Sequence, residues 1–270
     1  MAKPNSKIVQ GHQARKRFGQ NFLSDQHYIN RIVAAIAPQS QDTMVEIGPG
    51  LGAITELLID QVGKLDLVEL DKDLIPRLEQ KFQQEHLTIH HSDALKFDFS
   101  SLVANEGDDL RIVGNLPYNI STPLIFHLLS FRQHIKDMYF MLQKEVVERI
   151  CAAPNSKTYG RLSIMSQYYC QAEMLFTVPP GAFQPAPKVD SAIIRLTPRA
   201  ENQLSALNPD KLSEIVTAGF NQRRKTIRNN LKKHISDSEL ESLAINPGAR
   251  PETLAIDQFV TIANYLSILT

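Results

Sequence analysis

The fold is decided by the stretch Thr43-Met44-Val45-Glu46-Ile47-Gly48-Pro49-Gly50-Leu51-Gly52. Its first five residues have the apolar character of a buried strand, and the segment from Ala53 to Gln61 has helical periodicity. The glycines between them permit a tight turn and let the backbone approach a ligand closely. Amide groups at the start of the helix would then face that ligand. The stretch predicts a strand, a binding turn and a helix, although a turn with only a structural role has the same pattern.

Strand-like and helix-like segments alternate on the carboxyl side of this stretch. We predict strands over residues 64–70, 87–91, 110–113 and 136–142, and helices over residues 53–61, 74–84, 122–129 and 144–152. Two more strand-like segments, residues 167–176 and 191–197, flank a proline-rich loop. On the amino side, residues 1–22 look irregular, and a helix is expected from Ser24 or Asp25 with Ile29, Ile32, Val33 and Ile36 on one face. The alternation indicates an α/β fold with a mostly parallel sheet covered on both faces.

The pattern changes near residue 200. A polar stretch bounded by Pro198 and Pro209 is followed by helix-like segments only, over residues 211–220, 226–234, 237–243 and 256–269. We therefore predict two domains, an α/β domain over residues 1–200 and a small all-α domain over residues 201–270.

Acidic residues follow the second and third predicted strands. The second strand ends in Glu69-Leu70-Asp71, where an α/β fold places a carboxylate that accepts hydrogen bonds from ribose hydroxyls. Asp93 follows the third strand, and the carboxyl ends of parallel strands meet at one crevice. Dinucleotide turns prefer the spacing G-x-G-x-x-G, whereas this chain has G-x-G-x-G with Ala53 at the sixth position. The turn alone allows a dinucleotide or S-adenosylmethionine, which has no pyrophosphate.

The fourth predicted strand ends in Asn115-Leu116-Pro117-Tyr118. An exocyclic amino group of a base is a poor nucleophile because its lone pair is delocalised into the ring. The side-chain oxygen of Asn115 and the carbonyl oxygen of Leu116 could accept hydrogen bonds from it and favour a pyramidal nitrogen. Pro117 would stiffen the backbone, and Tyr118 offers a ring on which the base can stack. An ordinary turn fits this string too, but its place after the fourth strand favours amino-group methylation.

A base removed from its stack needs a second aromatic side chain. The proline-rich loop at residues 178–189 carries Phe183, which could face Tyr118 across the base. An apolar anchor for a long loop would explain Phe183 equally well.

The charge is balanced in total but not in distribution. The chain has 29 basic and 29 acidic residues, so its net charge does not indicate a nucleic-acid partner. Basic residues nevertheless cluster within residues 3–17 and again at Arg223, Arg224, Lys225, Arg228, Lys232 and Lys233, which could present a positive face to phosphates. Cys151 and Cys170 are expected to be free thiols, and we expect no metal site, secretory signal or membrane span.

Seven segments then establish a resemblance over residues 17–191. They are Arg17–Leu23, Glu46–Gly52, Val68–Asp71, Ser92–Leu95, Gly114–Ser121, Pro180–Phe183 and Pro185–Ser191. In this order they resemble the KsgA/RsmA family of small-subunit ribosomal RNA adenine dimethyltransferases, which have a class I (Rossmann-like) methyltransferase domain. Macrolide-resistance enzymes, which act on large-subunit RNA, share the glycine and Asn-Leu-Pro-Tyr segments less closely. The segment Phe220–Thr226 also resembles the basic helix of the family's small domain.

The resemblance implies a set of roles. Asn21, Leu23, Gly48, Glu69, Asp93 and Asn115 would contact S-adenosylmethionine. Asn115, Leu116, Pro117 and Tyr118 would hold the target amino group, with Phe183 as the opposing stack. The implied reaction is dimethylation of N6 on two adjacent adenosines in the 3′-terminal hairpin of 16S rRNA, during small-subunit (30S) ribosome biogenesis. The implied partner is the small subunit or its late precursor, the expected state is a cytoplasmic monomer, and loss of the enzyme would give kasugamycin resistance.

Two other functions remain open at this point. An RNA-binding assembly factor, or a mitochondrial transcription factor, could use the same fold without needing catalysis. An NAD-dependent enzyme is the third hypothesis and rests on the glycine turn alone. Together, Glu69, Asp93 and the Asn115–Tyr118 string favour the methyltransferase.

Overall fold

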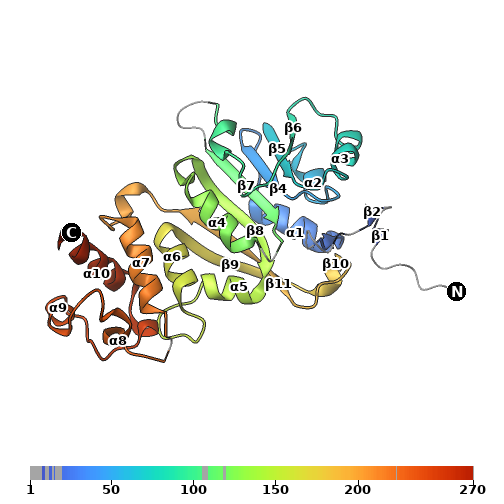
Figure 1. The fold of residues 1–270 in the computed structure, drawn as a ribbon. Coiled ribbons are helices and arrows are strands. Elements are labelled where there is room, and N and C mark those ends of the chain that lie inside the picture. Colours follow the sequence, from blue (N-terminus) through green and yellow to red (C-terminus); the bar gives the residue numbers. More distant parts are fainter. Residues whose placement is uncertain are drawn as a thin grey trace. The chain divides into compact units, whose positions relative to one another are not determined.

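The computed structural model describes residues 8–9, 12–13, 15, 20–104, 109–117, 120–222 and 224–269. The chain forms two compact units, and Figure 1 shows its elements. Unit 1 comprises Met1–Val147 and Glu173–Pro198, and unit 2 comprises Glu148–Ala172 and Arg199–Thr270. No helix in the described ranges combines the length and the apolar character that crossing a bilayer requires.

Unit 1 is built on a seven-stranded sheet with the order β6-β5-β4-β7-β8-β11-β9. The strands are β4 (Thr43–Ile47), β5 (Lys64–Glu69), β6 (Leu87–His91), β7 (Leu110–Asn115), β8 (Ile135–Gln143), β9 (Cys170–Val178) and β11 (Ser191–Pro198). Strands β4 to β8 run parallel to one another, and β11 is antiparallel to β8. The predicted α/β fold with a mostly parallel sheet is confirmed. Because β5 and β7 flank β4 on opposite sides, the carboxyl end of β4 is the switch point where such folds bind ligands.

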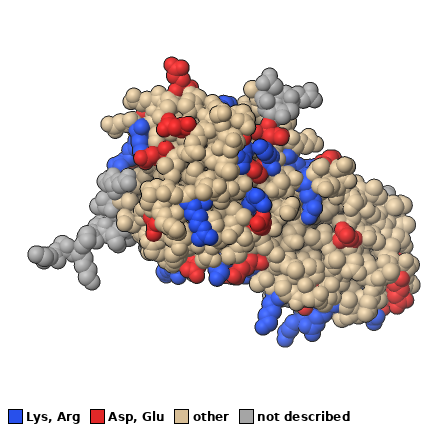
Figure 2. Space-filling view, turned by 180° about the vertical axis from the view of Figure 1, so that it is seen from behind, with Lys and Arg blue, Asp and Glu red and all other residues tan. Residues whose placement is uncertain are grey.

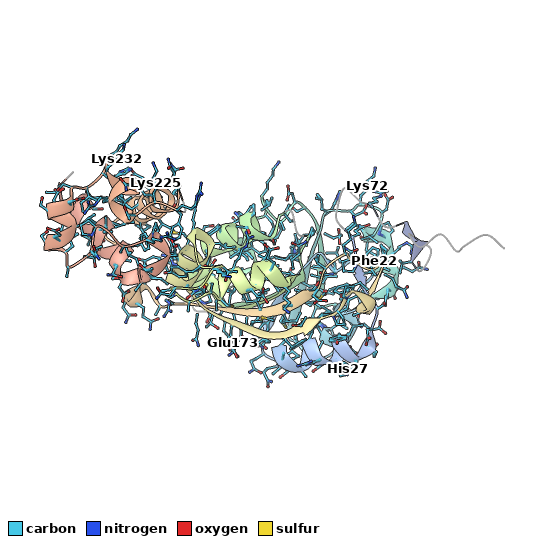
Figure 3. All side chains as sticks on the ribbon, turned by 90° about the horizontal axis from the view of Figure 1, so that it is seen from below. Phe22, His27, Lys72, Glu173, Lys225 and Lys232 are labelled. Carbon is cyan, nitrogen blue, oxygen red and sulfur yellow. The ribbon has the colours of Figure 1, made fainter. Side chains whose placement is uncertain are left out.

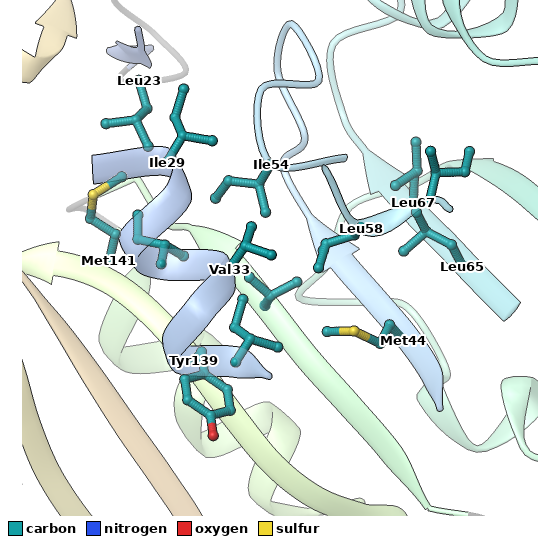
Figure 4. Packing of buried hydrophobic residues seen from close by; sticks show 14 of the residues in the cluster. Leu23, Ile29, Val33, Met44, Ile54, Leu58, Leu65, Leu67, Tyr139 and Met141 are labelled. Carbon is teal, nitrogen blue, oxygen red and sulfur yellow. The ribbon is translucent and has the colours of Figure 1, made fainter. Parts of the chain in front are cut away.

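Helices cover both faces of this sheet. They are α1 (Gln26–Ile36), α2 (Thr55–Leu58), α3 (Ile75–Lys81), α4 (Ser121–Leu129) and α5 (Lys144–Ile150), the last continuing into unit 2. Helices α1 to α3 share one core cluster with Met44, Tyr139 and Met141 (Figure 4). None of the buried residues of α4 belongs to that cluster, and α4 lies on the other face (Figure 1). Burial on both faces explains the nearly continuous apolar sequence of β8.

Helix α1 shows how the sequence sets a local element. The Asp25 carboxylate accepts a hydrogen bond from the His27 amide at 2.9 Å and caps the helix. The buried residues are Ile29, Ile32, Val33 and Ile36, the face predicted from the periodicity. The helix ends at Ala37, which takes the left-handed conformation.

A buried ion network closes the end of the sheet opposite the switch point. Arg111, near the start of β7, makes two 2.9 Å hydrogen bonds to the Asp137 carboxylate and one of 2.7 Å to Asp42. It also donates to the Ile36 carbonyl oxygen at 2.7 Å. The network therefore joins α1, β7 and β8 to the residue before β4, and it leaves the carboxyl ends of the strands free for a ligand.

Unit 2 is helical, with α6 (Arg161–Tyr169), α7 (Pro209–Gly219), α8 (Ile227–Leu231), α9 (Asp237–Ser242) and α10 (Ile256–Leu269). Its second segment begins at Arg199, next to the boundary predicted at 200, but Glu148–Ala172 also belongs to it. Hydrogen bonds join the two segments: the Tyr159 hydroxyl donates to the Leu254 carbonyl oxygen at 3.1 Å. The Tyr168 hydroxyl accepts from the Ala206 amide at 2.9 Å.

Two predictions of secondary structure were wrong. Residues 167–169 belong to α6, and the strand begins only at Cys170. Helix α6 has no clear apolar face, because Ser163 and Ser166 are buried together with Ile164, Met165 and Tyr168. Residues 1–22 also contain the two-residue strands β1 (Ile8–Val9) and β2 (His12–Gln13) and the start of β3 (Phe22–Leu23).

Short elements complete the description. Strand β10 (Phe183–Gln184) lies outside the main sheet and pairs with β3. The 3₁₀ turns are η2 (Phe99–Leu102), η3 (Arg132–His134), η4 (Pro180–Ala182), η5 (Glu201–Gln203) and η6 (Pro251–Thr253).

Candidate active site

A pocket opens at the carboxyl ends of β4, β5, β6 and β7, within unit 1. Its lining combines apolar side chains with two carboxylates and three side-chain amides. The lining residues are Gln20, Asn21, Phe22, Ile47, Gly48, Gly50, Val68, Glu69, Leu70, Leu74, Ser92, Asp93, Ala94, Asn115, Leu116, Pro117, Ile120 and Phe183. Five of the six predicted cofactor residues are in this set, and Leu23 is not. The described catalytic candidates Asn115, Leu116, Pro117 and Phe183 are in it as well, whereas Tyr118 lies outside the described residues.

The glycine turn after β4 forms one wall of the pocket. Gly48, Gly50 and Gly52 all have positive φ, between 60° and 76°. At Gly50 an added Cβ would also lie 3.0 Å from the Phe22 ring, so both the conformation and the space demand glycine. The Gly48 amide donates to the Val68 carbonyl oxygen at 2.9 Å, which fixes the turn against β5.

Glu69 is the acid that faces the pocket. Its carboxylate accepts from the Gly50 amide at 3.3 Å and from the Asp71 amide at 2.7 Å. Burial raises the pKa of Glu69, although the backbone hydrogen bonds oppose the shift. Asp71, the other acid of the segment, does not line the pocket and has a side chain that is only 1% exposed. The structure thus places Glu69, the acid that the resemblance assigns to the cofactor, in the pocket lining and Asp71 outside it.

Asp93 lies after β6, the strand that pairs with β5, and also lines the pocket. One carboxylate oxygen accepts from the Leu95 amide at 3.0 Å, and the Asp93 carbonyl oxygen accepts from the Lys96 amide at 2.9 Å. These bonds hold the side chain at the strand end, and the second carboxylate oxygen can accept from a ligand.

The loop after β7 contributes Asn115 and Leu116 to the pocket lining. Asn115 donates from Nδ2 to the Asn21 carbonyl oxygen at 3.0 Å, which leaves its Oδ1 to face away from Asn21. The Leu116 amide donates to the Met141 carbonyl oxygen at 3.2 Å, and the Leu116 side chain is buried. The backbone of this loop is therefore held from both sides.

A close approach sets the position of that loop. An added Cβ on Gly114 would lie 2.7 Å from the Ile47 carbonyl oxygen, so only glycine lets β7 run this close to β4. The glycine turn and the Asn115 loop are thereby held next to each other.

Phe183 reaches the pocket through a long-range strand pair. Strand β10 is antiparallel to β3, with Phe183 opposite Leu23 and Gln184 opposite Phe22. The Ala182 carbonyl oxygen also accepts from the Ser24 amide at 2.9 Å. Phe183 is 3% exposed and packs in the core cluster together with Leu23 while it lines the pocket. The pairing explains why segments near residues 20 and 183 belong to one site.

Glu46, the acid before the glycine turn, lies outside the pocket lining. It is fully buried and accepts a hydrogen bond from Thr55 Oγ1 at 2.5 Å. Burial raises its pKa to about 7, and the nearby Glu69 carboxylate adds to the shift. The side chain links the end of β4 to the first turn of α2.

The lining fits S-adenosylmethionine. The carboxylate of Glu69 could accept hydrogen bonds from ribose hydroxyls, and that of Asp93 could accept from an adenine amino group. Apolar walls for a flat ring come from lining residues for which the sequence predicted no role, Ile47, Val68, Leu70, Leu74 and Ile120. Their apolar character alone could not distinguish them from core residues. Phe22 belongs to the Arg17–Leu23 segment of the resemblance, and no role was predicted for it either.

The sequence is similar to those of known proteins along almost its whole length. The sequence model of the ribosomal RNA adenine dimethylase family matches residues 11–267. A protein of Tolumonas auensis named ribosomal RNA small subunit methyltransferase A is 58% identical over 264 residues, which cover 97% of this chain and 98% of that protein. A protein of the same name from Saccharophagus degradans is 56% identical over 267 residues, covering 98% and 99%.

Solved structures give the same result at lower identity. A crystal structure of a dimethyladenosine transferase from Plasmodium falciparum superposes with a TM-score of 0.78 at 26% identity, covering 89% of this chain and 95% of that one. The 23S rRNA methyltransferase ErmE superposes with a TM-score of 0.68 at 24% identity, covering 92% and 100%, and supports the class I methyltransferase fold. The chain therefore belongs to the ribosomal RNA adenine dimethylase family and is an S-adenosylmethionine-dependent rRNA adenine dimethyltransferase.

Proposed function

We propose that this chain dimethylates N6 of two adjacent adenosines in the 3′-terminal hairpin of 16S rRNA, on the small subunit or a late precursor of it. The observation that carries the proposal is that Asn115 and Leu116 line the same pocket as Gly48, Glu69 and Asp93. A methyl donor held by Gly48, Glu69 and Asp93 would therefore lie beside an amino group held by Asn115 and Leu116. The names of the relatives quoted above support the small subunit as the target.

The proposed cofactor contacts follow from the pocket. Glu69 would accept hydrogen bonds from the ribose hydroxyls and Asp93 from the adenine amino group, while Gly48 and Asn21 would contact the rest of the donor. Leu23 has a buried side chain, so its contact would come from the backbone. When bound, the donor supplies an electrophilic methyl group on a sulfonium.

The proposed catalytic contacts are acceptor oxygens. Asn115 Oδ1 and the Leu116 carbonyl oxygen would accept hydrogen bonds from the target amino group and direct its lone pair toward the methyl group. The Leu116 amide is hydrogen-bonded to the Met141 carbonyl oxygen, and the ring of Pro117 restricts the backbone that follows. The acceptor oxygens are therefore positioned before the base arrives. Positioning of this kind provides much of the rate in a displacement that needs nitrogen, methyl and sulfur in line. Phe183 and Tyr118 would hold the base from its two faces.

The proposed rRNA-binding domain is residues 201–270. Arg224, Lys225, Arg228, Lys232 and Lys233 are all exposed there, around α8, and Figure 3 labels Lys225 and Lys232 on this unit. Arg223 lies outside the described residues. The face that Figure 2 shows carries basic and acidic side chains in small groups. Such groups bind phosphates without any need for a basic protein as a whole.

A purely RNA-binding role is the second candidate, and the pocket argues against it. Binding alone requires neither the buried Glu69 carboxylate nor the fixed acceptor loop at Asn115. We further propose that the chain acts in the cytoplasm as a monomer, and that cells without it resist kasugamycin.

The decisive experiment is methyl transfer to small subunits from cells that lack this protein. Purified subunits are incubated with the enzyme and S-adenosylmethionine, and their 16S rRNA is digested and analysed by mass spectrometry. We expect a gain of four methyl groups on one fragment that holds two adjacent adenosines. Methylation of other positions, or of large-subunit RNA instead, would refute the proposed substrate. Binding without any methyl transfer would favour the second candidate.

A further inference from the structure

One short segment contacts several parts of the active site. We call Gln20–Leu23 the strap. The Asn21 carbonyl oxygen accepts from Asn115, the Phe22 ring lies against Gly50, and Leu23 pairs with Phe183. Gln20, Asn21 and Phe22 also line the pocket. The strap therefore contacts the glycine turn, the acceptor loop and the Phe183 loop at once.

The strap is anchored at its amino end by Asp71. Gln20 donates from Nε2 to Asp71 Oδ2 at 2.8 Å, and Arg15 donates from Nη1 to Asp71 Oδ1 at 2.9 Å. The Arg15 amide in turn donates to Gln20 Oε1 at 2.8 Å. The three residues close a ring of hydrogen bonds, and Arg15 makes a further ion pair with Asp73.

Asp71 is joined to the pocket without lining it. Its amide donates to Glu69 Oε1 at 2.7 Å, while its carboxylate holds Arg15 and Gln20. One residue thus connects the pocket's Glu69 to the strap on the far side of the glycine turn. A carboxylate that is 1% exposed is costly unless it is paired, so the position favours an aspartate that keeps these partners.

A small apolar cluster strengthens the same anchorage. Phe22 packs with Val9 and Leu74, and Leu51 of the glycine turn lies against them. Val9 comes from β1, so the amino-terminal region contacts the strap from outside. Leu74 follows Asp71 and Asp73 in the chain, so polar and apolar contacts to the strap come from the same loop.

We propose that Asp71 is a positioning residue for methyl-donor binding, acting through Gln20 and Arg15 to hold the strap against the pocket. Asp71 does not line the pocket, so its effect on the donor would pass through these neighbours. Without the anchor, the amino end of the strap is held less firmly, and the pocket wall that Asn21 and Phe22 form is less well positioned for the donor. The identity of the ligand rests on the proposed function, whereas the anchor is a property of this chain alone.

The test uses Asp71→Asn, Arg15→Ala and the double variant, with Asp60→Asn as the matched control. Asp60 is exposed on unit 1, outside the pocket, and its substitution removes the same charge. Calorimetry measures the affinity for S-adenosylmethionine, steady-state kinetics measures KM and kcat, and hydrogen exchange without ligand measures the opening of residues 20–23.

We expect Asp71→Asn to weaken donor binding about tenfold or more, the loss that accompanies a hydrogen bond to a charged group. KM for the donor rises in step, while kcat at saturation changes little, because the acceptor oxygens are intact. In the ligand-free variant, amide hydrogen exchange becomes faster in the strap and stays unchanged in the central strands. Because both residues act through one ring, adding Arg15→Ala to Asp71→Asn causes little further loss. Asp60→Asn behaves like the unsubstituted protein.

Unchanged donor affinity in a folded Asp71→Asn variant would overturn the proposal, as would fully additive effects of the two substitutions. If Asp71→Asn does not fold, Arg15→Ala decides alone, since its side chain is 29% exposed. If the unsubstituted protein does not bind S-adenosylmethionine, the proposed function fails. In that case, hydrogen exchange of residues 20–23 in the ligand-free variants still shows whether Asp71 anchors the strap.

Discussion

Asn115 and Asn21 are joined by a 3.0 Å hydrogen bond from the Asn115 side chain to the Asn21 carbonyl oxygen. The bond determines which end of the Asn115 amide faces the pocket. With Nδ2 directed at Asn21, Oδ1 is the atom left for a substrate amino group. The two residues are 94 positions apart, so this orientation is a product of the fold.

We expect Asn115→Ala to lower kcat by about 10²–10³-fold, the usual loss when one preorganised hydrogen-bonding group is removed from a transition state. The variant should fold and bind small subunits normally, because its side chain contributes only one hydrogen bond to the described structure. Methyl transfer in single turnover, together with a subunit-binding assay, checks both parts. Full turnover by the variant would show that Asn115 does not hold the reacting nitrogen.

Gly50 gives a prediction on donor binding. Gly50→Ala would place a Cβ at a φ of +60° and 3.0 Å from the Phe22 ring. We expect it to weaken S-adenosylmethionine binding by about tenfold, because left-handed strain of 1 to 2 kcal/mol displaces the turn. Gly181→Ala is the matched control, since a Cβ there meets no atom within 4 Å. Equal affinities for the two variants would contradict the role given to the turn.

The basic cluster of unit 2 predicts a salt effect. We expect Lys232→Glu to weaken binding to small subunits and to reduce the slope of log affinity against log salt, because phosphate contacts release counterions. Lys96→Glu, at an exposed lysine of unit 1, is the control with the same change of charge. Filter binding from low to moderate salt measures both. Identical slopes for the two variants would make the cluster ordinary surface.

The sequence could predict those parts of the site that follow a strand. Gly48, Glu69, Asp93 and Asn115 each come at the end of a parallel strand, and the topology alone places such residues in one crevice. Six strands of the main sheet and the apolar face of α1 could be predicted as well, because their sequence patterns are local.

The parts that could not be predicted depend on distant contacts. The β3–β10 pair joins residues 160 positions apart, and nothing in either two-residue strand indicates its partner. Asp71 lies outside the pocket lining, and its hydrogen bonds to Arg15 and Gln20, 56 and 51 positions away, could not be predicted from the sequence. Helix α6 is buried on several sides, so its sequence lacks the polar face by which helices are found.

A substitution at Phe183 distinguishes a ring that stacks on the target base from one that only anchors the loop. Phe183→Leu keeps an apolar side chain in the core but removes the stacking surface. We expect kcat/KM to fall about 5- to 150-fold, the equivalent of 1 to 3 kcal/mol for one base stacked on an aromatic ring. Phe99→Leu replaces a fully buried ring outside the pocket lining and should lower stability without this loss. If both variants lose activity only in proportion to stability, Phe183 is an anchor.

Glu46 makes stability depend on pH. Its pKa is raised by burial from 4.5 to about 7, so the folded protein favours the neutral acid. Below pH 4.5 the group is protonated in both states and costs nothing. As pH rises toward 7, the unfolded chain ionises it first, so the free energy of unfolding falls through this window by about 3 kcal/mol in total.

Glu46→Gln keeps an oxygen for the Thr55 hydroxyl and removes the titration. Urea unfolding at pH 5, 6, 7 and 8 measures the free energy of unfolding. The value for the variant should rise relative to that of the unsubstituted protein as pH increases, and the difference should be complete by pH 8. Glu85→Gln, at an exposed glutamate, controls for the exchange of side chains. Parallel curves for Glu46→Gln and the unsubstituted protein would mean that Glu46 is ionised in the fold. The acid before the glycine turn would then be a buried carboxylate held charged by its neighbours.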